Sequence, residues 1–377
     1  MQKYVFLLGR EPLLSMAEIQ SLFPSVERSG DFALVQAEKE DIEWFQNGLG
    51  WTIKIALVLG EWLKKTELLS CIISEAIKKV EQGKKLRIGI DMFVPSMSSL
   101  VFKAKDALKV QWHSVRVVQH DWWRLKTATT IHEKLIEQGI EFIVFSDKEG
   151  FTVAQTVWIQ DIESYTERDI DRDRSMTVGM MPPKIAQIMI SLGTQGKKDT
   201  VIWDPFCGLG TTLIEALHGW YRDLLGSDLA SEMVDITRKN IEKQPWYNSH
   251  NIDIFRLDAT QIESRKLSSS TIVVTEGMLG KNFTSTNITH EWILAERKHL
   301  TELYQAFLDS AYKNTHIKKM VFCLPFWNIG RETIYMPDMT QLSKAWWIDA
   351  LSRSSKRYLF HLRPWQCVGR EIIVASR

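Results

Sequence analysis

The feature that most restricts the fold is a glycine-rich loop between a short apolar strand and a helix. The loop reads Asp204-Pro205-Phe206-Cys207-Gly208-Leu209-Gly210-Thr211-Thr212. Its two glycines lack side chains, which lets the backbone approach a ligand closely. The free N–H groups at the start of the helix favour a negatively charged group. We also expect Thr212 and Glu215 to form a capping box. The loop therefore predicts a ligand site at the carboxyl end of a strand.

Strands and helices alternate strictly around this loop. The expected strands are Thr200–Trp203, Leu224–Ser227, Ile254–Leu257, Thr271–Thr275, Lys319–Leu324, Tyr358–His361 and Glu371–Val374. The expected helices are one starting near Lys184, then Thr211–His218, Ala230–Lys243, Glu291–Lys313 and Gln341–Leu351. This alternation predicts an α/β fold with a doubly wound, mainly parallel sheet and a ligand at the carboxyl ends of its strands.

Acidic residues end three successive strands of this pattern: Asp204, Asp228 and Asp258. Asp204 is placed to accept a hydrogen bond from an ammonium group or a bound water. Asp228 follows the loop at roughly the 20-residue offset of an acid that binds ribose hydroxyls. Asp258 is placed to meet an adenine amino group. The alternative interpretation is that acids at strand ends only form turns.

The N-terminal part reads as two smaller α/β segments. We expect strands at Tyr4–Leu8, Phe32–Gln36, Thr52–Leu59, Leu86–Asp91, Val115–Gln119, Phe142–Ser146 and Thr152–Ile159. The expected helices are Ser15–Leu22, Asp41–Asn47, Glu67–Val80, Ser98–Trp112 and Thr130–Gln138. Ser15 and Glu18 have the spacing of a capping box. Residues 164–174 carry many charges of both signs and no core pattern, which indicates a linker.

A positive excess is confined to one module. Between Gly60 and Lys126 there are thirteen Lys/Arg and seven Asp/Glu, although the whole chain carries only +1. Such an excess is what contact with a nucleic-acid backbone requires. Solvated helix faces are the competing interpretation.

The four cysteines are scattered without a CxxC pair, which argues against a disulfide scaffold and a zinc site. No cluster has metal-ligand spacing. No stretch reaches the roughly 20 apolar residues that a membrane span needs, and no secretory leader is visible. These observations favour a reducing, cytoplasmic location.

Several motifs together resemble those of THUMP-domain tRNA guanosine N2-methyltransferases, beginning with the loop Asp204–Thr211. The others are Phe6-Leu7-Leu8-Gly9-Arg10-Glu11-Pro12, the stretches Gln160–Asp169 and Val178–Ile190, and the closing segment Arg363–Ile372. The resemblance spans nearly the whole chain.

The resemblance implies three domains and a linker. They are an N-terminal ferredoxin-like domain at 1–59, a THUMP-like RNA-binding domain at 60–163, a linker at 164–183, and a Rossmann-like class I methyltransferase domain at 184–377. It further implies S-adenosyl-L-methionine (SAM) as cofactor and tRNA as partner, with a small activating protein subunit left open. The residues it implies for cofactor binding are Asp204, Pro205, Cys207, Gly208, Gly210, Thr211, Asp228 and Asp258.

One segment departs from the family pattern. Members carry Asp-Pro-Pro-Tyr after the fourth strand, whereas this chain has Thr275-Glu276-Gly277-Met278-Leu279-Gly280. Glu276 is the only acid there, and the two glycines predict a more pliable loop. Candidates for lining a base pocket are Met278, Phe283, Phe326 and Trp327.

Three hypotheses follow from this departure. In the first, Glu276 accepts a hydrogen bond from an exocyclic amine, which then attacks the methyl group in line. In the second, the target atom is different. In the third, the domain binds SAM and tRNA without transferring a methyl group. The first hypothesis is our prediction, with guanosine N2 as the target; a tRNA-binding relative without activity and a DNA methyltransferase are the alternatives.

Overall fold

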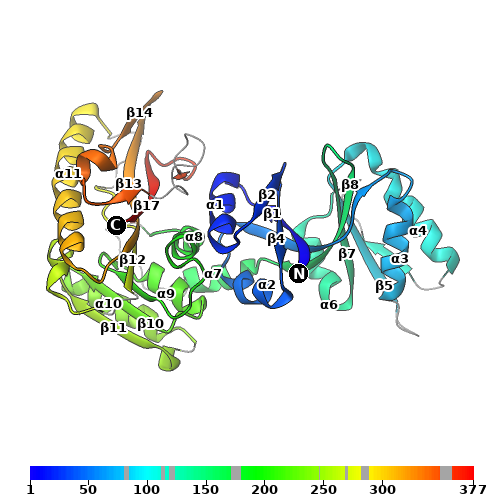
Figure 1. Ribbon diagram of the computed structural model, residues 1–377, viewed down its shortest axis with the longest axis horizontal. Coiled ribbons are helices and arrows are strands. Elements are labelled where there is room, and N and C mark those ends of the chain that lie inside the picture. The colour runs from blue at the N-terminus through cyan, green and yellow to red at the C-terminus, as the bar shows by residue number, and fades with distance from the viewer. Residues whose placement is uncertain are drawn as a thin grey trace. The chain divides into compact units, whose positions relative to one another are not determined.

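The computed structural model divides into two compact units, each with its own sheet (Figure 1). The first unit comprises residues 1–10, 25–46 and 52–160, and the second comprises residues 11–24, 47–51 and 161–377. The structure describes residues 1–79, 85–111, 115–118, 124–170, 180–245, 247–267, 271–281, 288–348 and 359–377. Some predictions therefore fall on positions outside the described residues: Val80, Lys84, Trp112, Gln119, residues 171–179, Phe283, residues 349–351 and Tyr358.

The described residues of the first unit form an eight-stranded sheet in the order β2-β3-β1-β4-β8-β7-β5-β6. The strands are β1 (Gln2–Leu8), β2 (Val26–Ser29), β3 (Phe32–Ala37), β4 (Thr52–Leu63), β5 (Leu86–Met92), β6 (Val115–Val118), β7 (Gly139–Ser146) and β8 (Phe151–Ile159). Strand β2, a short and partly exposed edge strand, was not expected from the sequence. Because β4 pairs with β1 on one side and β8 on the other, the sheet runs without a break through both expected N-terminal segments.

Five helices accompany the described part of this sheet: α2 (Lys39–Phe45), α3 (Leu68–Lys78), α4 (Ser99–Gln111), α5 (Thr127–His132) and α6 (Leu135–Gln138). Apolar residues of α3 and α4 share a core with β5 and β7. The single helix expected at Thr130–Gln138 is interrupted, because Lys134 takes a left-handed conformation with φ of 50°.

A charged network lies inside the first unit. The ammonium of Lys54 is 2.7 Å from a carboxylate oxygen of Glu141 and 3.3 Å from one of Asp91, and all three side chains are almost fully buried. Thr130 and Thr156 donate hydrogen bonds to Glu141, and Arg124 pairs with Asp91. Buried charges persist only when they are paired and hydrogen-bonded in this way.

The sheet of the second unit has the main order β11-β10-β9-β12-β13-β17-β15, with β14 paired to β13 and β16 to β17. The strands are β9 (Val201–Asp204), β10 (Asp223–Asp228), β11 (Asn251–Arg256), β12 (Thr271–Thr275), β13 (Lys319–Ile329), β14 (Glu332–Tyr335), β15 (Trp347–Ile348), β16 (Leu359–His361) and β17 (Val368–Ser376). Strands β9 to β13 are mutually parallel and β17 is antiparallel. The expected doubly wound, mainly parallel sheet of a Rossmann-like fold is therefore confirmed.

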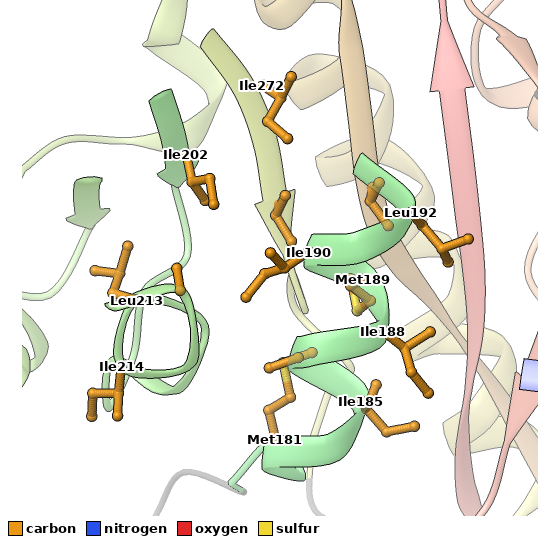
Figure 2. Close-up of a cluster of buried hydrophobic side chains, with 14 of the residues drawn as sticks. Met181, Ile185, Ile188, Met189, Ile190, Leu192, Ile202, Leu213, Ile214 and Ile272 are labelled. Carbon is orange, nitrogen blue, oxygen red and sulfur yellow. The ribbon is translucent and has the colours of Figure 1, made fainter. Parts of the chain in front are cut away.

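Side chains alternate between the two faces of this sheet. Ile202 and Ile272 belong to the core that includes α8 (Pro183–Thr194) and α9 (Thr211–His218), whereas Trp203 and Val273 belong to the core under α11 (His290–Lys313). Figure 2 shows Ile190 of α8 on the side that faces Ile202 and Ile272, whereas Ile185 and Ile188 point to the other side of the helix. The period of two explains why each strand is buried on both sides.

Helix α1 (Pro12–Leu22) belongs to the second unit, where its Leu14 and Ala17 share the core of α8. The capping box expected at Ser15 and Glu18 is wrong, because the helix already begins at Pro12. Ser15 instead donates to the carbonyl of Trp51, and buried Glu18 accepts from the backbone N–H of Gly50. Burial raises the pKa of Glu18 to about 8.

The helix expected at Gln341–Leu351 is also wrong in its described part. A one-turn helix, α12 (Met339–Leu342), ends there, and residues 347–348 form strand β15. Trp346 is buried and its indole N–H donates to the carbonyl of Leu308 in α11. This tertiary contact and the pairing of β15 with β17 override the local helical pattern.

Candidate functional site

A cavity of about 830 Å³ opens at the carboxyl ends of the parallel strands of the second unit. The strand order reverses between β9 and β12, and this is where open α/β sheets bind ligands. The volume of the cavity lies within the usual range of small-molecule binding sites. The expected binding residues that line it are Asp204, Pro205, Cys207, Gly208, Thr211, Asp228 and Asp258.

Asp204 ends β9 and is 2% exposed. Its Oδ1 accepts hydrogen bonds from the hydroxyl of Thr275 (2.6 Å) and the backbone N–H of Phe206 (3.1 Å). Burial raises the pKa of Asp204 to about 6, although these hydrogen bonds act in the opposite direction. Because Thr275 ends β12, its hydroxyl joins the two strands on either side of the switch point.

The glycine-rich loop is held from the next strand. Asp228 Oδ2 accepts from the backbone N–H of Gly208 at 3.0 Å, and Thr237 donates to the carbonyl of Gly208 at 2.7 Å. Gly208 and Gly210 have φ of +50° and +83°, a region that glycine enters without strain. Gly210 is not itself at the cavity wall: it precedes α9 and abuts Thr237. Asp228 thus fixes the loop whose backbone faces the cavity.

Asp258 serves as the N-cap of the turn of 3₁₀ helix at Ala259–Ser264. Its Oδ1 accepts from the backbone N–H and the hydroxyl of Thr260, both at 2.8 Å. The structure therefore gives this acid a turn-forming role while also placing it at the cavity wall.

The capping box expected for Thr212 and Glu215 is wrong. Helix α9 follows Gly210 without a side-chain cap, and Glu215 is fully buried elsewhere. Arg168 binds both carboxylate oxygens of Glu215, and Gln187 donates to one of them. The sequence spacing was right for a cap, but a buried arginine offers the carboxylate a stronger partner.

The loop after β12 is firmly held rather than pliable. Gly277 and Gly280 have φ of +71° and +87°, and a Cβ added to either would lie within 3.0 Å of Tyr304 or Glu296. The hydroxyl of Tyr304 lies 3.0 Å from the carbonyl oxygen of Met278 and 2.8 Å from that of Cys323. Burial raises the pKa of Tyr304 well above its usual value, so this hydroxyl remains a donor. The expectation of a pliable loop is therefore corrected.

Glu276 lines the cavity as part of an ion pair that sequence reasoning missed. Nε of Arg370 lies 2.6 Å from Oε1 of Glu276, and the side chains are 5% and 16% exposed. Arg370 also lines the cavity. The only sequence signal was its place in the closing segment that resembles the methyltransferase family. The 94-residue separation between the partners left no spacing rule to apply.

The expected base-pocket residues have different fates. Met278 lines the cavity. Phe326 and Trp327 do not, because β13 continues as a strand to Ile329 and both side chains are buried within the fold. Phe326 packs against Gly369 and near Tyr335, and Trp327 lies in the core under α11. Phe283 is outside the described residues.

Neither a metal cluster nor a membrane-spanning helix occurs in the part of the chain that the structure describes. No group of three or more His, Cys, Asp or Glu side chains among those residues is arranged to hold a metal ion. Among the same residues, no helix combines the length and apolar character that crossing a membrane requires.

Comparison with known proteins gives a family match for the second unit. Residues 172–325 match the family model described as "RMKL-like, methyltransferase domain". The curated tRNA (guanine(10)-N2)-dimethyltransferase of Methanothermobacter thermautotrophicus is 32% identical over 136 residues, which are 36% of this chain and 35% of that protein. The enzyme of the same name from Methanocaldococcus jannaschii is 28% identical over 162 residues, 42% of this chain and 44% of that protein. The matches thus span less than half of these relatives.

Solved structures give weaker likenesses over nearly the full chain. TrmN from Thermus thermophilus has a TM-score of 0.47 and 14% identity, covering 100% of this chain and 99% of its own. The SAH complex of SMU.472 has a TM-score of 0.48 and 13% identity, covering 98% and 97%. The family match is the stronger finding: residues 172–325, within the second unit, are similar to the RMKL-like methyltransferase domain.

Proposed function

We propose that this protein is a SAM-dependent methyltransferase that modifies an exocyclic base nitrogen of tRNA, namely guanosine N2. The observation that carries the proposal is one cavity shared by the glycine-rich loop with its three acids and by the Glu276 loop. The similarity to two curated tRNA guanine-N2 methyltransferases supports the choice of substrate. That substrate also favours a cytoplasmic location.

The residues at the cavity fit the cofactor. A ligand with an ammonium group and ribose hydroxyls needs carboxylate acceptors and close approach of the backbone. Asp204 and Asp228 supply the acceptors, and the Gly208 loop allows the close approach. Asp258 and the apolar wall at Met233 and Leu229 would hold the adenine end. When bound, SAM supplies an electrophilic methyl group.

The remaining steps belong to side chains of this chain. Glu276 accepts a hydrogen bond from the target amine and so orients its lone pair, while Met278 provides an apolar surface for the base. Tyr304 keeps the loop that carries Glu276 and Met278 in place, because its hydroxyl binds the carbonyl of Met278. Preorganised acceptors of this kind cost no rearrangement during the reaction.

The first unit would supply tRNA binding. In this proposal residues 1–59 are a ferredoxin-like domain and residues 60–163 a THUMP-like domain. A linker at 164–183, whose first part belongs to helix α7 (Ile162–Ile170), joins them to the methyltransferase domain at 184–377. The exposed side chains of Lys64, Lys65, Lys103 and Lys109 are suited to phosphate contacts. Whether a small activating subunit is required is tested below by adding a cell extract.

Incubation with methyl-labelled SAM and unmodified tRNA, followed by nucleoside mass spectrometry, tests the proposal. We expect label in N2-methylguanosine, and its loss in Asp204→Ala and Glu276→Ala. Glu332→Ala is the matched control, because this exposed glutamate pairs with His290 away from the cavity.

The other outcomes separate the alternatives. Label in a different nucleoside would show a different target atom. In a parallel incubation with DNA, label in DNA but not in tRNA would favour a DNA methyltransferase. No label, with SAM and tRNA both bound and with a cell extract added to supply any subunit, would favour a binding protein without activity.

A further inference from the structure

The Glu276–Arg370 ion pair is unusual in its position. Both side chains line the cavity, and Nε of Arg370 uses one donor on Oε1 of Glu276 at 2.6 Å. Among the described residues, neither terminal nitrogen of Arg370 has a hydrogen-bond partner. A guanidinium carries five N–H donors, so most of them remain for a ligand.

The arginine is set rigidly on its strand. Arg370 lies in β17 opposite Pro325 of β13, and the adjacent Gly369 lies under the ring of Phe326. A Cβ at position 369 would lie 2.0 Å from Phe326 Cζ, so only glycine permits this packing. The packing fixes the strand at the point where the guanidinium leaves it.

An ion pair this buried contributes little net stability, because desolvation offsets the attraction. Because both side chains line the cavity, the pair is within reach of a ligand there. The pair presents a carboxylate acceptor beside guanidinium donors. Enzymes that modify a base read its Watson–Crick edge with such groups.

Only guanine among the four bases presents two adjoining donors, N2–H and N1–H, followed by an acceptor, O6. We propose that the pair reads this edge, with Glu276 accepting from N2–H and N1–H and Arg370 donating to O6. Arg370 is thus a specificity-determining residue. This inference rests on the proposed function and adds the means by which guanine is selected.

A competition assay tests it with two tRNAs that differ in one base. One carries guanosine at the methylated position and the other 2,6-diaminopurine, which keeps the N2 amine but replaces O6 by an amino group and lacks N1–H. Because a site built to hydrogen-bond a group strongly rejects an analogue without it, we expect the wild-type protein to prefer guanosine by about 100-fold or more in kcat/KM. In Arg370→Met we expect the preference to fall by about tenfold or more, the remainder coming from Glu276 and N1–H, and in Arg370→Lys to fall by less.

The ratio measured in one tube does not depend on the folded fraction, so partial unfolding of a variant leaves it unchanged. Arg168→Met is the matched control, since it breaks the buried ion pair with Glu215 and neither residue lines the cavity. The control should keep the wild-type ratio.

Two results would overturn the inference while leaving the proposed function intact. One is equal methylation of both tRNAs by the wild-type protein. The other is an Arg370→Met protein that loses both activities by the same factor, which would make the arginine purely structural. Absence of methylation of any RNA would instead refute the proposed function, and the inference with it.

Discussion

At the scale of single residues, the buried carboxylate of Asp204 lowers the stability of the folded chain when it is ionised, and the same residue lines the cavity. Its pKa of about 6 means that the ionised carboxylate is less favourable in the folded chain than in water, because burial removes hydration. Such residues are often retained for function at the expense of stability.

We expect Asp204→Asn to be more stable than the wild-type protein at pH 8. The folded-state pKa lies above the ordinary value of 3.8, so the wild-type protein loses stability as the pH rises from about 4 through 6. The loss is about 2–3 kcal/mol by the size of the shift, and the asparagine variant does not undergo it. Urea unfolding of both proteins at pH 4.5 and pH 8 measures this. A difference in unfolding free energy that is the same at both pH values would contradict it.

The acids at the strand ends were accessible to sequence reasoning, because Asp204, Asp228 and Asp258 end three successive apolar strands. Arg370 was not, because its relation to Glu276 depends on the antiparallel register of β17 with β13. Glu215 was wrongly predicted to cap helix α9, because the capping-box spacing takes no account of Arg168, which is distant in sequence. Local sequence patterns thus identify the residues at the ends of successive strands. They do not identify pairs of residues that are distant in sequence and meet only in the folded sheet.

At the scale of elements, the segment from Thr275 to Lys281 is held by hydrogen bonds on several sides. Its backbone N–H groups donate to Thr275 Oγ1 and Glu296 Oε1, and Tyr304 binds the carbonyl of Met278. The two positive-φ glycines give it a fixed shape. A loop without prolines is preorganised here by its neighbours.

Gly277→Ala tests that fixed shape. A Cβ there would lie 2.4 Å from the hydroxyl of Tyr304, in addition to the strain of a positive φ. We expect a loss of about 3 kcal/mol or more of unfolding free energy. The control Gly330→Ala has a φ of +62° but no atom within 4 Å of the added Cβ, so we expect only about 1–2 kcal/mol. Chemical denaturation compares them, and equal losses would show that the clash with Tyr304 is unimportant.

Periodicity predicted the long elements well. The helix expected at Glu291–Lys313 is α11 at His290–Lys313, and the helix expected at Thr211–His218 is α9. Short elements depended on tertiary interactions that no local pattern contains. Strand β2 exists because it pairs with β3, and the segment after Ser343 is extended because Trp346 is buried against α11.

At the scale of the whole molecule, charge is distributed unevenly along a nearly neutral chain. The positive excess of residues 60–126 lies in the first unit, and part of it is already paired: Arg116 with Glu133 and Arg124 with Asp91. The exposed lysines are therefore the ones available for a polyanion.

Reversing the charge of four of these lysines should weaken tRNA binding in a salt-dependent manner. We expect Lys64, Lys65, Lys103 and Lys109, all changed to Glu, to flatten the slope of log K against log salt by about 0.7–0.9 for each phosphate that is no longer neutralised. The control is Lys39→Glu with Lys148→Glu, two exposed positions of the same unit outside the basic stretch. Filter binding at several salt concentrations gives both slopes, and equal slopes would argue against this surface.

Alternation of strands and helices was enough to predict the parallel sheet of the second unit. It was not enough to predict that a single sheet joins residues 1–59 to residues 60–163, since β4 pairs with a strand about 100 residues later. Pairings of such sequence separation leave no local signature.

The membership of α1 in the second unit has a consequence for modularity. A fragment cut at residue 161 would contain every strand of the parallel sheet, yet it would lack α1, the helix that shares the core of α8. It would expose an apolar helix face and be prone to aggregate. The methyltransferase domain is therefore not a detachable part of this chain, and its N-terminal sequence cannot be exchanged without supplying a substitute for α1.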